Sequence, residues 1–401
     1  MELRGANVLV VGFERTGRAL APFLLGRGAR VRITDRKPAG AFGASLRALA
    51  GRGVAFEMGG HKPASFLRAD LIVPSPGVPP LPAILAARDK GVPVLSELEL
   101  ASRFLRGRVI AITGSNGKST TTVLVHRMLA DSGRRAFLAG NIGRPLVSFV
   151  DKSRAGDIYV TEVSSFQLAY TERFAPDVAA FLNVSENHTD WHGSFEGYFA
   201  AKSGLIGRLG PEGRAVLNRD DPRVWGLAAG ARGRVYGFSR KRRPARGAYL
   251  GDGWIVTRDG TAERIAPVST IRLPGAHNVE NVLAAALIGR LMDAPAASLR
   301  RSIRAFRGLE HRLEDVLWVR GVRFVNDSKA TTVDATLKAL DSFDRPIILI
   351  LGGRGKGGDF APLRPAVRRR ARSVVLVGEA ADKIEAALGG VVPVVRAANY
   401  R

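Results

Sequence analysis

The 401-residue chain contains no cysteine, which excludes disulfide bonds and thiolate metal ligands from any account of its stability or chemistry. It has no apolar run long enough to span a membrane, and residues 1–4 show no signal-peptide pattern. Aromatic residues make up only 7% of the chain, and 36 acidic residues face 61 basic ones. From these absences we expect a cytoplasmic protein without a membrane partner.

The formal net charge of +25 is the most unusual bulk property. Such a charge can indicate a nucleic-acid-binding protein, for example a polynucleotide-dependent ATPase. The basic residues, however, are mostly arginine and are spread through the whole chain, without a dense tail or a stripe interleaved with aromatics. We therefore expect no nucleic-acid partner and favour a compositional origin of the charge, which also suits phosphorylated, anionic substrates.

The length predicts two or three domains, and 46% hydrophobic residues provide ample material for their cores. The chain begins with alternating strand and helix patterns, which predicts an α/β fold. A charged stretch at residues 102–108 indicates a domain boundary before the next strand. That strand, residues 109–113, is followed by a helical pattern over residues 121–129.

Between that strand and that helix lies the pattern Gly-x-x-Gly-Lys-Ser, which is typical of a phosphate-binding loop. Gly114 and Gly117 allow backbone N–H groups to face an anion. Lys118 can reach terminal phosphates, and Ser119 can offer its hydroxyl to Mg²⁺. The usual first glycine of this motif is replaced by Ile112.

The N-terminal segment has a Rossmann-like pattern: a strand over residues 6–11, a glycine turn, a helix, and a second strand that ends at Asp35. Glu14 occupies the position of the middle glycine, which argues against simple NAD binding. A nucleotide diphosphate near Arg15 and Thr16 remains an open alternative. Further strands are expected at residues 71–73 and 92–95.

The loop at residues 74–80 follows one of these strands and is stiffened by prolines. It is either a ligand site at the carboxyl end of a strand or an ordinary connector.

In the central segment, Glu162 ends a predicted strand, as magnesium-binding acids of phosphate-loop proteins do. Residues 183–190, which include His188, follow the next strand and indicate a second metal or substrate site.

Short strands and turns are expected from residue 204 to about residue 271, and a helix over residues 282–291. Asn278 and Asn281 share one face of the first turn, where they either cap the helix or bind a ligand. The C-terminal segment predicts a hairpin and then further strands and a helix. Its lysines beside strand-end loops are candidate anion ligands.

Taken together, these segments resemble the Mur ligase family, the ATP-dependent amide-bond ligases of peptidoglycan precursor synthesis. The motifs that carry the resemblance lie at residues 113–120, 140–143, 162–168, 277–281, 311–312 and 326–331. Residues 12–17, 75–77 and 326–331 are most similar to the branch that joins D-glutamate to UDP-N-acetylmuramoyl-L-alanine. The resemblance extends from the first predicted strand to the last residue.

The resemblance implies three α/β domains. They are a Rossmann-like domain for the UDP substrate (residues 1–105), a central phosphate-loop ATPase domain (106–308) and a Rossmann-like amino-acid-binding domain (309–401). The family's last domain continues with a further strand and a loop that holds the D-glutamate carboxylate, whereas this sequence stops at Tyr400 and Arg401. We therefore expect the third domain to be incomplete, and the chain to bind ATP and the UDP substrate but to ligate poorly.

The resemblance also implies site residues. The ATP site would comprise Gly114, Ser115, Asn116, Gly117, Lys118, Ser119, Thr120, Asn278, Asn281, Arg312 and Asp327. The UDP-substrate site would comprise Arg15, Thr16, Asp35, Arg36, Ser75, Gly77 and Asn141. D-Glutamate and the acyl phosphate would be approached by Lys329, Thr331 and Lys356. Two Mg²⁺ ions would be bound by Ser119, Glu162, His188 and Lys202, the last as a lysine carbamate. The catalytic residues would be Lys118, His188, Lys202, Lys329 and Lys356.

The implied reaction begins with attack of the substrate carboxylate on the γ-phosphorus of ATP and continues with attack of D-glutamate on the acyl phosphate. Cations are needed because the first step brings two anions together. We expect a monomer with small-molecule substrates. Two alternatives to D-glutamate ligation are a Mur-family ligase for another amino acid and the nucleic-acid-binding ATPase. A Rossmann oxidoreductase is disfavoured by Glu14 and the phosphate loop.

Overall fold

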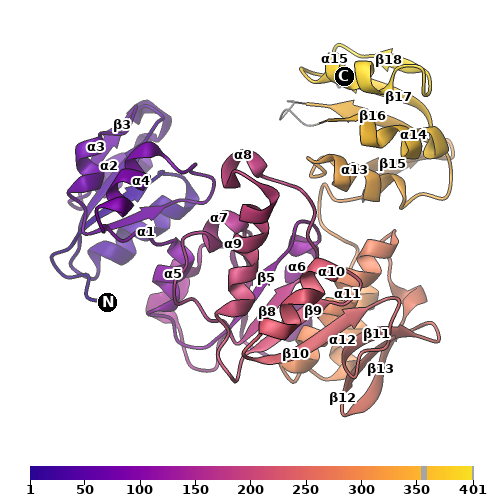
Figure 1. Cartoon of the computed structure of the whole chain (residues 1–401), viewed down its shortest axis with the longest axis horizontal. Coiled ribbons are helices and arrows are strands. Elements are labelled where there is room, and N and C mark those ends of the chain that lie inside the picture. Colours follow the sequence, from indigo (N-terminus) through magenta and orange to yellow (C-terminus); the bar gives the residue numbers. More distant parts are fainter. Residues whose placement is uncertain (354–358, 400–401) are drawn as a thin grey trace.

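The computed structural model describes residues 1–353 and 359–399, which form three α/β units that follow one another along the chain (Figure 1). The predicted fold class, a Rossmann-like N-terminal domain, a central phosphate-loop domain and a Rossmann-like C-terminal domain, is confirmed. None of the helices that these residues form combines the length and apolar character needed to cross a membrane.

The N-terminal unit is a four-stranded parallel sheet in the order β3-β2-β1-β4. Its strands are β1 (Asn7–Val11), β2 (Arg30–Asp35), β3 (Ala55–Met58) and β4 (Leu71–Pro74). Its helices are α1 (Arg15–Leu25), η1 (Ala39–Ala41), α2 (Gly43–Ala50), α3 (Pro63–Leu67) and α4 (Pro82–Asp89). A Cβ atom on Gly17 would lie 2.1 Å from the carbonyl oxygen of Gly12, so glycine is needed where α1 packs against the end of β1.

The strand predicted at residues 92–95 is wrong, because only Val94 forms a bridge, with Ile72. Pro93 has no N–H to donate, so pairing with β4 is restricted to the Pro93 carbonyl and the Leu95 N–H. The chain then enters helix α5 (Glu97–Ser102), which is capped by the Ser96 hydroxyl.

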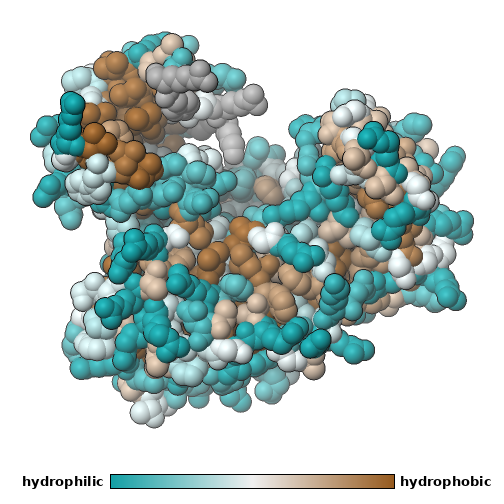
Figure 2. Space-filling view, turned by 180° about the vertical axis from the view of Figure 1, so that it is seen from behind, coloured by the Kyte–Doolittle hydropathy of each residue, from teal (hydrophilic) through white to brown (hydrophobic). Residues whose placement is uncertain are grey.

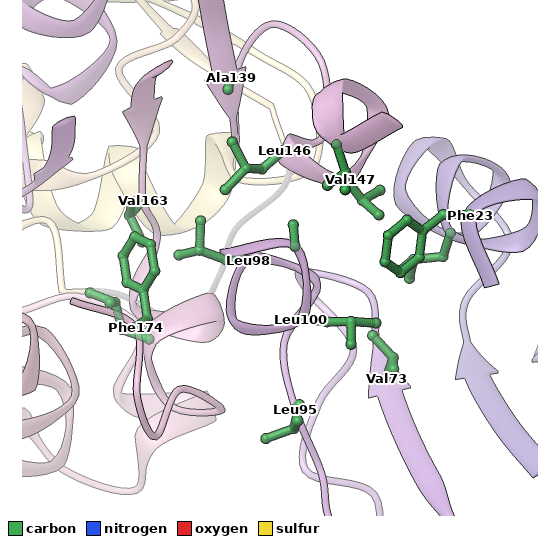
Figure 3. Packing of buried hydrophobic residues seen from close by; sticks show 14 of the residues in the cluster. Phe23, Val73, Leu95, Leu98, Leu100, Ala139, Leu146, Val147, Val163 and Phe174 are labelled. Carbon is green, nitrogen blue, oxygen red and sulfur yellow. The ribbon is translucent and has the colours of Figure 1, made fainter. Parts of the chain in front are cut away.

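Helix α5 links the N-terminal and central units through a shared apolar core. Figure 3 shows Leu98 directed toward Val163 and Phe174 of the central unit, whereas Leu100 is directed toward Val73 of β4. Because one short helix packs against both units, the N-terminal unit is held at a defined place beside the central sheet.

The central unit contains a nine-stranded sheet in the order β13-β12-β11-β10-β9-β8-β5-β7-β6, antiparallel only at β11-β12-β13. Its strands are β5 (Arg108–Thr113), β6 (Ala136–Gly140), β7 (Ile158–Glu162), β8 (Val178–Phe181), β9 (Arg214–Asn218), β10 (Arg234–Ser239), β11 (Arg246–Gly251), β12 (Trp254–Asp259) and β13 (Thr261–Pro267). Its helices are α6 (Lys118–Ala130), η2 (Leu146–Lys152), α7 (Ser165–Leu168), α8 (Thr189–His192), α9 (Phe195–Gly207), α10 (Pro222–Gly226), η3 (Leu227–Gly230), η4 (Val268–Thr270), α11 (Ala276–Leu291) and α12 (Ala296–Ala305). The parallel strands β5, β7 and β8 all end on the side where polar residues were predicted to gather.

The C-terminal unit has a two-stranded hairpin and a three-stranded parallel sheet in the order β16-β17-β18. Its strands are β14 (Glu314–Val319), β15 (Val322–Asn326), β16 (Ile347–Gly352), β17 (Ala371–Val377) and β18 (Val394–Arg396). Its helices are α13 (Val333–Leu340), η5 (Ala361–Leu363), α14 (Arg364–Arg370) and α15 (Ala381–Leu388). The predicted hairpin at Gly321 is present, with Arg320 and Gly321 both at positive φ.

Hydrophobic side chains gather on the surface of this last unit in the view from behind (Figure 2). Among the exposed large hydrophobic residues are Trp318 in the hairpin and Ile348 and Ile350 on β16.

The domain boundaries predicted at residues 105/106 and 308/309 fall between α5 and β5 and between α12 and β14. As domain boundaries they stay a prediction.

Candidate active site

The phosphate loop lies between β5 and α6, as the sequence pattern predicts. Gly114 and Gly117 have φ values of +155° and +80°, which side-chain-bearing residues rarely adopt. A Cβ atom on Gly117 would lie 2.1 Å from the Oδ1 atom of Asn281 on α11. The loop therefore approaches α11 so closely that only glycine fits at residue 117.

Two lysine side chains meet at one carbonyl oxygen of this loop. Lys118 Nζ donates to the carbonyl oxygens of Gly114 and Ser115, each at 2.9 Å. Lys202 Nζ, from helix α9, donates to the same Gly114 oxygen at 3.0 Å and lies 3.2 Å from Thr113 Oγ1. The two amino groups consequently lie side by side at the base of the loop.

Both lysines have lowered pKa values. Burial is the main cause of the low pKa of Lys118, and Arg312 lowers it further while Glu162 opposes the shift. Burial again dominates for Lys202, whose pKa lies well below its ordinary value, with the neighbouring Lys118 as the second cause. A lysine in this state is readily neutral and nucleophilic.

Glu162, at the end of β7, lies at the centre of a hydrogen-bond network. Its Oε2 accepts from Ser119 Oγ at 2.6 Å, and its Oε1 accepts from Asn141 Nδ2 at 2.7 Å. Ser119 Oγ in turn accepts from Arg312 Nη2 at 3.1 Å. The predicted magnesium ligands Ser119 and Glu162 are thus in direct contact, and their binding of a shared metal stays a prediction.

A cavity of about 230 Å³ lies between the central and C-terminal units. Thirteen of the predicted site residues line it: Ser115, Asn116, Gly117, Lys118, Ser119, Thr120, His188, Asn278, Asn281, Arg312, Asp327, Lys329 and Thr331. The residues assigned to ATP and those assigned to the amino acid therefore share one space. Glu162 and Lys202 lie behind the loop and contact Ser119 and Gly114 from the buried side.

Asn278 and Asn281 lie at the start of α11, and both are buried. Asn281 Nδ2 donates to Asn278 Oδ1 at 3.1 Å, and Asn278 Nδ2 donates to the Pro274 carbonyl at 2.7 Å. Neither amide caps the helix, whose N-terminal flanking residue is Gly275. The capping role is therefore absent, and ligand binding by these amides stays a prediction.

The C-terminal unit contributes the other wall of the cavity. Asp327 is half-buried, which raises its pKa, and its Oδ1 accepts the Leu313 N–H at 3.1 Å. Asp334, in the first turn of α13, accepts hydrogen bonds from Asn116 Nδ2 at 2.6 Å and Ser185 Oγ at 2.9 Å. These contacts place α13 over the phosphate loop, on the side of the C-terminal unit that faces the central one (Figure 1).

The residues predicted for a UDP substrate lie apart from this cavity, around the turn after β1. Asp35 is buried, and its carboxylate accepts the N–H groups of Phe13 at 2.7 Å and Lys37 at 2.9 Å. Ser75 Oγ donates to the Gly12 carbonyl at 3.1 Å. Thr16 is buried in the first turn of α1, Arg36 is exposed, and Gly77 has a φ of +89°. Asp35 thus shapes the turn through its backbone contacts.

Arg15 connects this turn with the central unit. Its Nη2 donates to the carbonyl oxygens of Gly140 at 3.2 Å and Asn141 at 2.9 Å. Asn141 is therefore in contact with the N-terminal unit through its backbone and with Glu162 through its side chain. This continuous path joins the predicted substrate turn to the predicted metal ligands.

His188 precedes the one-turn helix α8 and has a φ of +54°. Its ring lies 4.7 Å from that of Phe166 and faces the cavity lining. Within residues 1–353 and 359–399, no three His, Asp or Glu side chains gather as a ready-made metal cluster. A metal here would need the serine, a modified lysine, or ligand oxygens to complete its coordination.

Sequence reasoning missed several contributors to this site. Asp334 and Lys338, one helical turn apart on α13, form an ion pair at 3.0 Å beside the cavity. Their charged i, i+4 spacing was the available indication. Trp191 and His192 were likewise passed over although they follow His188 closely. Lys356, assigned to the amino acid, lies outside the described residues.

The fold and the site together define a multidomain enzyme built around a phosphate-binding loop. Three family models match the chain in order: the Mur ligase MurD-like N-terminal domain at residues 6–96, the Mur ligase middle domain at residues 112–289, and the Mur ligase glutamate ligase domain at residues 311–400. The chain belongs to the Mur ligase family.

Two curated relatives are both named UDP-N-acetylmuramoylalanine–D-glutamate ligase. The protein of Acidobacterium capsulatum is 46% identical over 99% of this chain and 87% of its own length. That of Koribacter versatilis is 43% identical over 98% of this chain and 87% of its own length. Similarity at this level along the whole chain supports the family assignment in each of the three units.

Solved structures support the fold. UDP-N-acetylmuramate-alanine ligase from Thermotoga maritima superposes with a TM-score of 0.61 at 19% identity, over 98% of this chain and 90% of that one. A pseudomurein peptide ligase type C from Methanothermus fervidus superposes with a TM-score of 0.60 at 17% identity, over 99% of this chain and 90% of that one.

Proposed function

We propose that this chain is an ATP-dependent ligase that joins the amino group of D-glutamate to the terminal carboxylate of UDP-N-acetylmuramoyl-L-alanine, with release of ADP and phosphate. The names of the two relatives indicate both the substrate and the amino acid. The observation that carries the proposal is the single cavity in which the phosphate loop faces Lys329 and Thr331 of the glutamate ligase domain. An activated carboxylate and an incoming amine would meet there.

In this proposal, ATP occupies the cavity between the central and C-terminal units. Asn278 and Asn281 lie on the side of the adenine, Asp327 binds the ribose, and the phosphates lie on residues 114–120. Lys118 would leave the Gly114 carbonyl for the β- and γ-phosphates, which compensate for the burial of its charge. Arg312 lies 3.1 Å from Ser119 Oγ and adds a second positive charge beside the phosphates.

The UDP moiety would occupy the turn after β1, next to Arg15, Thr16, Arg36, Ser75 and Gly77. Asp35 would act mainly by shaping that turn, because its carboxylate oxygens already accept two backbone N–H groups. Asn141 would orient the muramoyl end, since it links the Arg15 contact to Glu162. The substrate carboxylate would thereby be directed from the N-terminal unit toward the phosphate loop.

The residues present fit two Mg²⁺ ions, which would neutralise charge between the substrate carboxylate and the γ-phosphate. Ser119 and Glu162 would hold the first ion, since their oxygens are only 2.6 Å apart and both face the loop. His188 and Lys202 would hold the second. The amine of Lys202 becomes a suitable oxygen ligand if it attacks carbon dioxide and loses a proton, which gives a carbamate.

Burial favours that modification, because it lowers the pKa of Lys202 and so favours the neutral, nucleophilic form of the amine. Labelled bicarbonate should produce a carbamate resonance in the wild type that Lys202→Arg lacks. A wild-type spectrum without this resonance would contradict the modification.

During the reaction, the chain's own residues mainly orient groups and exclude water. Lys118 would stabilise the charge that develops when the carboxylate attacks the γ-phosphorus. Lys329, with Lys356, would stabilise the tetrahedral intermediate that forms when the D-glutamate amine attacks the acyl phosphate. Helix α13, held over the loop by Asp334, would limit water access to that reactive ester.

The test is phosphate release by the 401-residue chain with Mg²⁺, ATP and UDP-N-acetylmuramoyl-L-alanine, with and without D-glutamate. Release that depends on D-glutamate is expected, at a low rate in line with the poor ligation expected from the sequence, and L-alanine or a diamino acid should not replace it. Stimulation by another amino acid alone would contradict the proposed specificity. Glu162→Gln should reduce the rate at least about 100-fold, whereas the exposed Glu196→Gln should leave it unchanged.

A further inference from the structure

Trp191 makes a contact between the central and N-terminal units that the proposed chemistry does not use. Its Nε1 donates to the carbonyl oxygen of Val78 at 3.1 Å. Val78 belongs to the loop that follows β4, one residue beyond Gly77. The indole therefore reaches from helix α8 to the loop predicted to contact the UDP substrate.

The N-terminal end of this contact is tightly connected to the turn after β1. The Val78 N–H donates to the Ser75 carbonyl at 3.1 Å, and Ser75 Oγ donates to the Gly12 carbonyl. A Cβ atom on Gly12 would lie 3.5 Å from Val78 Cγ2. A ligand that displaces this turn would consequently displace the carbonyl that Trp191 binds.

The other end leads to His188. The N–H of Trp191 donates to the His188 carbonyl at 3.1 Å within the single turn of α8. Phe166 lies between them in space, with its ring centroid 5.1 Å from that of Trp191 and 4.7 Å from that of His188. The position of the His188 ring is thus tied to that of the indole through backbone and ring contacts.

Helix α8 also contacts the central unit through His192, whose Nε2 lies 3.0 Å from Ser165 Oγ and whose ring stacks on that of Phe166. Trp191 packs instead against the apolar cluster that contains Val11, Ile72 and Tyr170. Since most of this cluster belongs to the N-terminal unit, Trp191 is the residue by which the His188 segment packs onto that unit.

We propose that Trp191 is a positioning residue that couples occupation of the UDP-substrate turn to the placement of His188 at the cavity. This inference rests on the proposed function, because it requires the UDP substrate at the β1 turn and a metal–nucleotide complex in the cavity. Binding at either place favours the same position of the segment, so each ligand strengthens the binding of the other.

The experiment compares the wild type with Trp191→Phe, which keeps an aromatic ring but cannot donate to Val78. Calorimetry measures the affinity for Mg²⁺ with a non-hydrolysable ATP analogue, with and without UDP-N-acetylmuramoyl-L-alanine. We expect the UDP substrate to tighten this binding by about tenfold in the wild type. In Trp191→Phe the tightening should fall by about fivefold, as one neutral hydrogen bond is lost.

Trp254→Phe is the matched control, because Trp254 lies on β12 at the far end of the central sheet and outside the cavity lining. It should keep the wild-type coupling. Equal coupling in Trp191→Phe and the wild type would overturn the inference. The UDP substrate should also shift the tryptophan emission of the wild type, and a spectrum that does not respond would overturn it as well, even if Trp191→Phe fails to fold.

Failure of the proposed function and failure of this inference can be distinguished by experiment. Absence of D-glutamate-dependent phosphate release would overturn the proposed function, whereas unchanged coupling in Trp191→Phe would overturn this inference alone. Activity measurements add a further readout. The half-saturating Mg²⁺ concentration should rise about fivefold in Trp191→Phe, while the affinity for the UDP substrate measured without nucleotide should change little.

Discussion

The carboxylate of Asp334 accepts a 2.6 Å hydrogen bond from the side-chain amide of Asn116, so the C-terminal unit touches the phosphate loop directly. The same Oδ2 atom accepts from Ser185 Oγ, beyond the end of β8, and pairs with Lys338 one turn along α13. One carboxylate therefore fixes the first turn of α13 against two segments of the central unit.

Replacement of this carboxylate should loosen the contact between the two units. We expect Asp334→Ala to lower kcat about tenfold, because both hydrogen bonds from the central unit to this charged but partly solvated group are lost. Small-angle scattering should show a larger radius of gyration. Asp341→Ala removes an exposed carboxylate of the same unit and should change neither quantity. An unchanged kcat in Asp334→Ala would contradict this role.

The close approach of the phosphate loop to α11 predicts a severe effect of a single methyl group. In Gly117→Ala the new Cβ would collide with Asn281, at a φ of +80°. We expect a loss of about 2 kcal/mol or more in unfolding free energy. ATP binding should be lost even at temperatures where the variant is folded. Gly133 has the same φ, but a Cβ atom there would meet no neighbour within 4 Å. Gly133→Ala therefore measures the cost of backbone strain without a collision.

Arg15 should affect the UDP substrate without affecting ATP. Its guanidinium binds the Gly140 and Asn141 carbonyls, whereas the cavity of the phosphate loop lies elsewhere. We expect Arg15→Ala to raise the KM for UDP-N-acetylmuramoyl-L-alanine about fivefold. The KM for ATP should stay unchanged, as should both values in the exposed Arg30→Ala. A parallel rise of both KM values would contradict this separation.

Glu97, buried in helix α5, should make stability depend on pH. Burial raises its pKa from 4.5 to about 7, although the Val147 N–H donates to its Oε1. The folded protein therefore binds the proton more tightly than the unfolded chain. This contribution to stability is fully present below pH 4.5 and is lost as pH rises through about 7.

The loss is at most about 3.5 kcal/mol, because the pKa values differ by about 2.5 and each unit of difference corresponds to about 1.4 kcal/mol. Urea unfolding at about pH 5 and about pH 8 measures it. Glu97→Gln can still accept from Val147 but does not titrate, so it should show a flatter dependence than the wild type. An identical dependence in both proteins would assign the effect to other groups.

Much of this site follows from local sequence, because loops at the ends of parallel strands meet at one sheet edge. Glu162 and the phosphate loop were predicted separately, and the parallel pairing of β5 with β7 brings them into contact. The Rossmann-like turn was also predicted, and glycine at residue 17 is required by the close approach to Gly12.

Contacts between units could not be predicted in this way. Asp334 and Trp191 are ordinary residues of short helices, and their partners lie more than a hundred residues away. Asp35 shows the same limit within one unit, since a carboxylate at a strand end can bind a ligand or its own backbone. The strand predicted at residues 92–95 failed because Pro93 restricts pairing, which an apolar pattern does not register.

The shared Gly114 carbonyl has a consequence for the energetics of nucleotide binding. Two amines whose burial disfavours the ammonium form surround one oxygen. A polyphosphate bound beside them would raise the pKa of Lys118 and favour its ammonium form. Where the pH lies near the pKa of Lys118, nucleotide binding should therefore be accompanied by proton uptake, and its observed enthalpy should vary with the ionisation heat of the buffer.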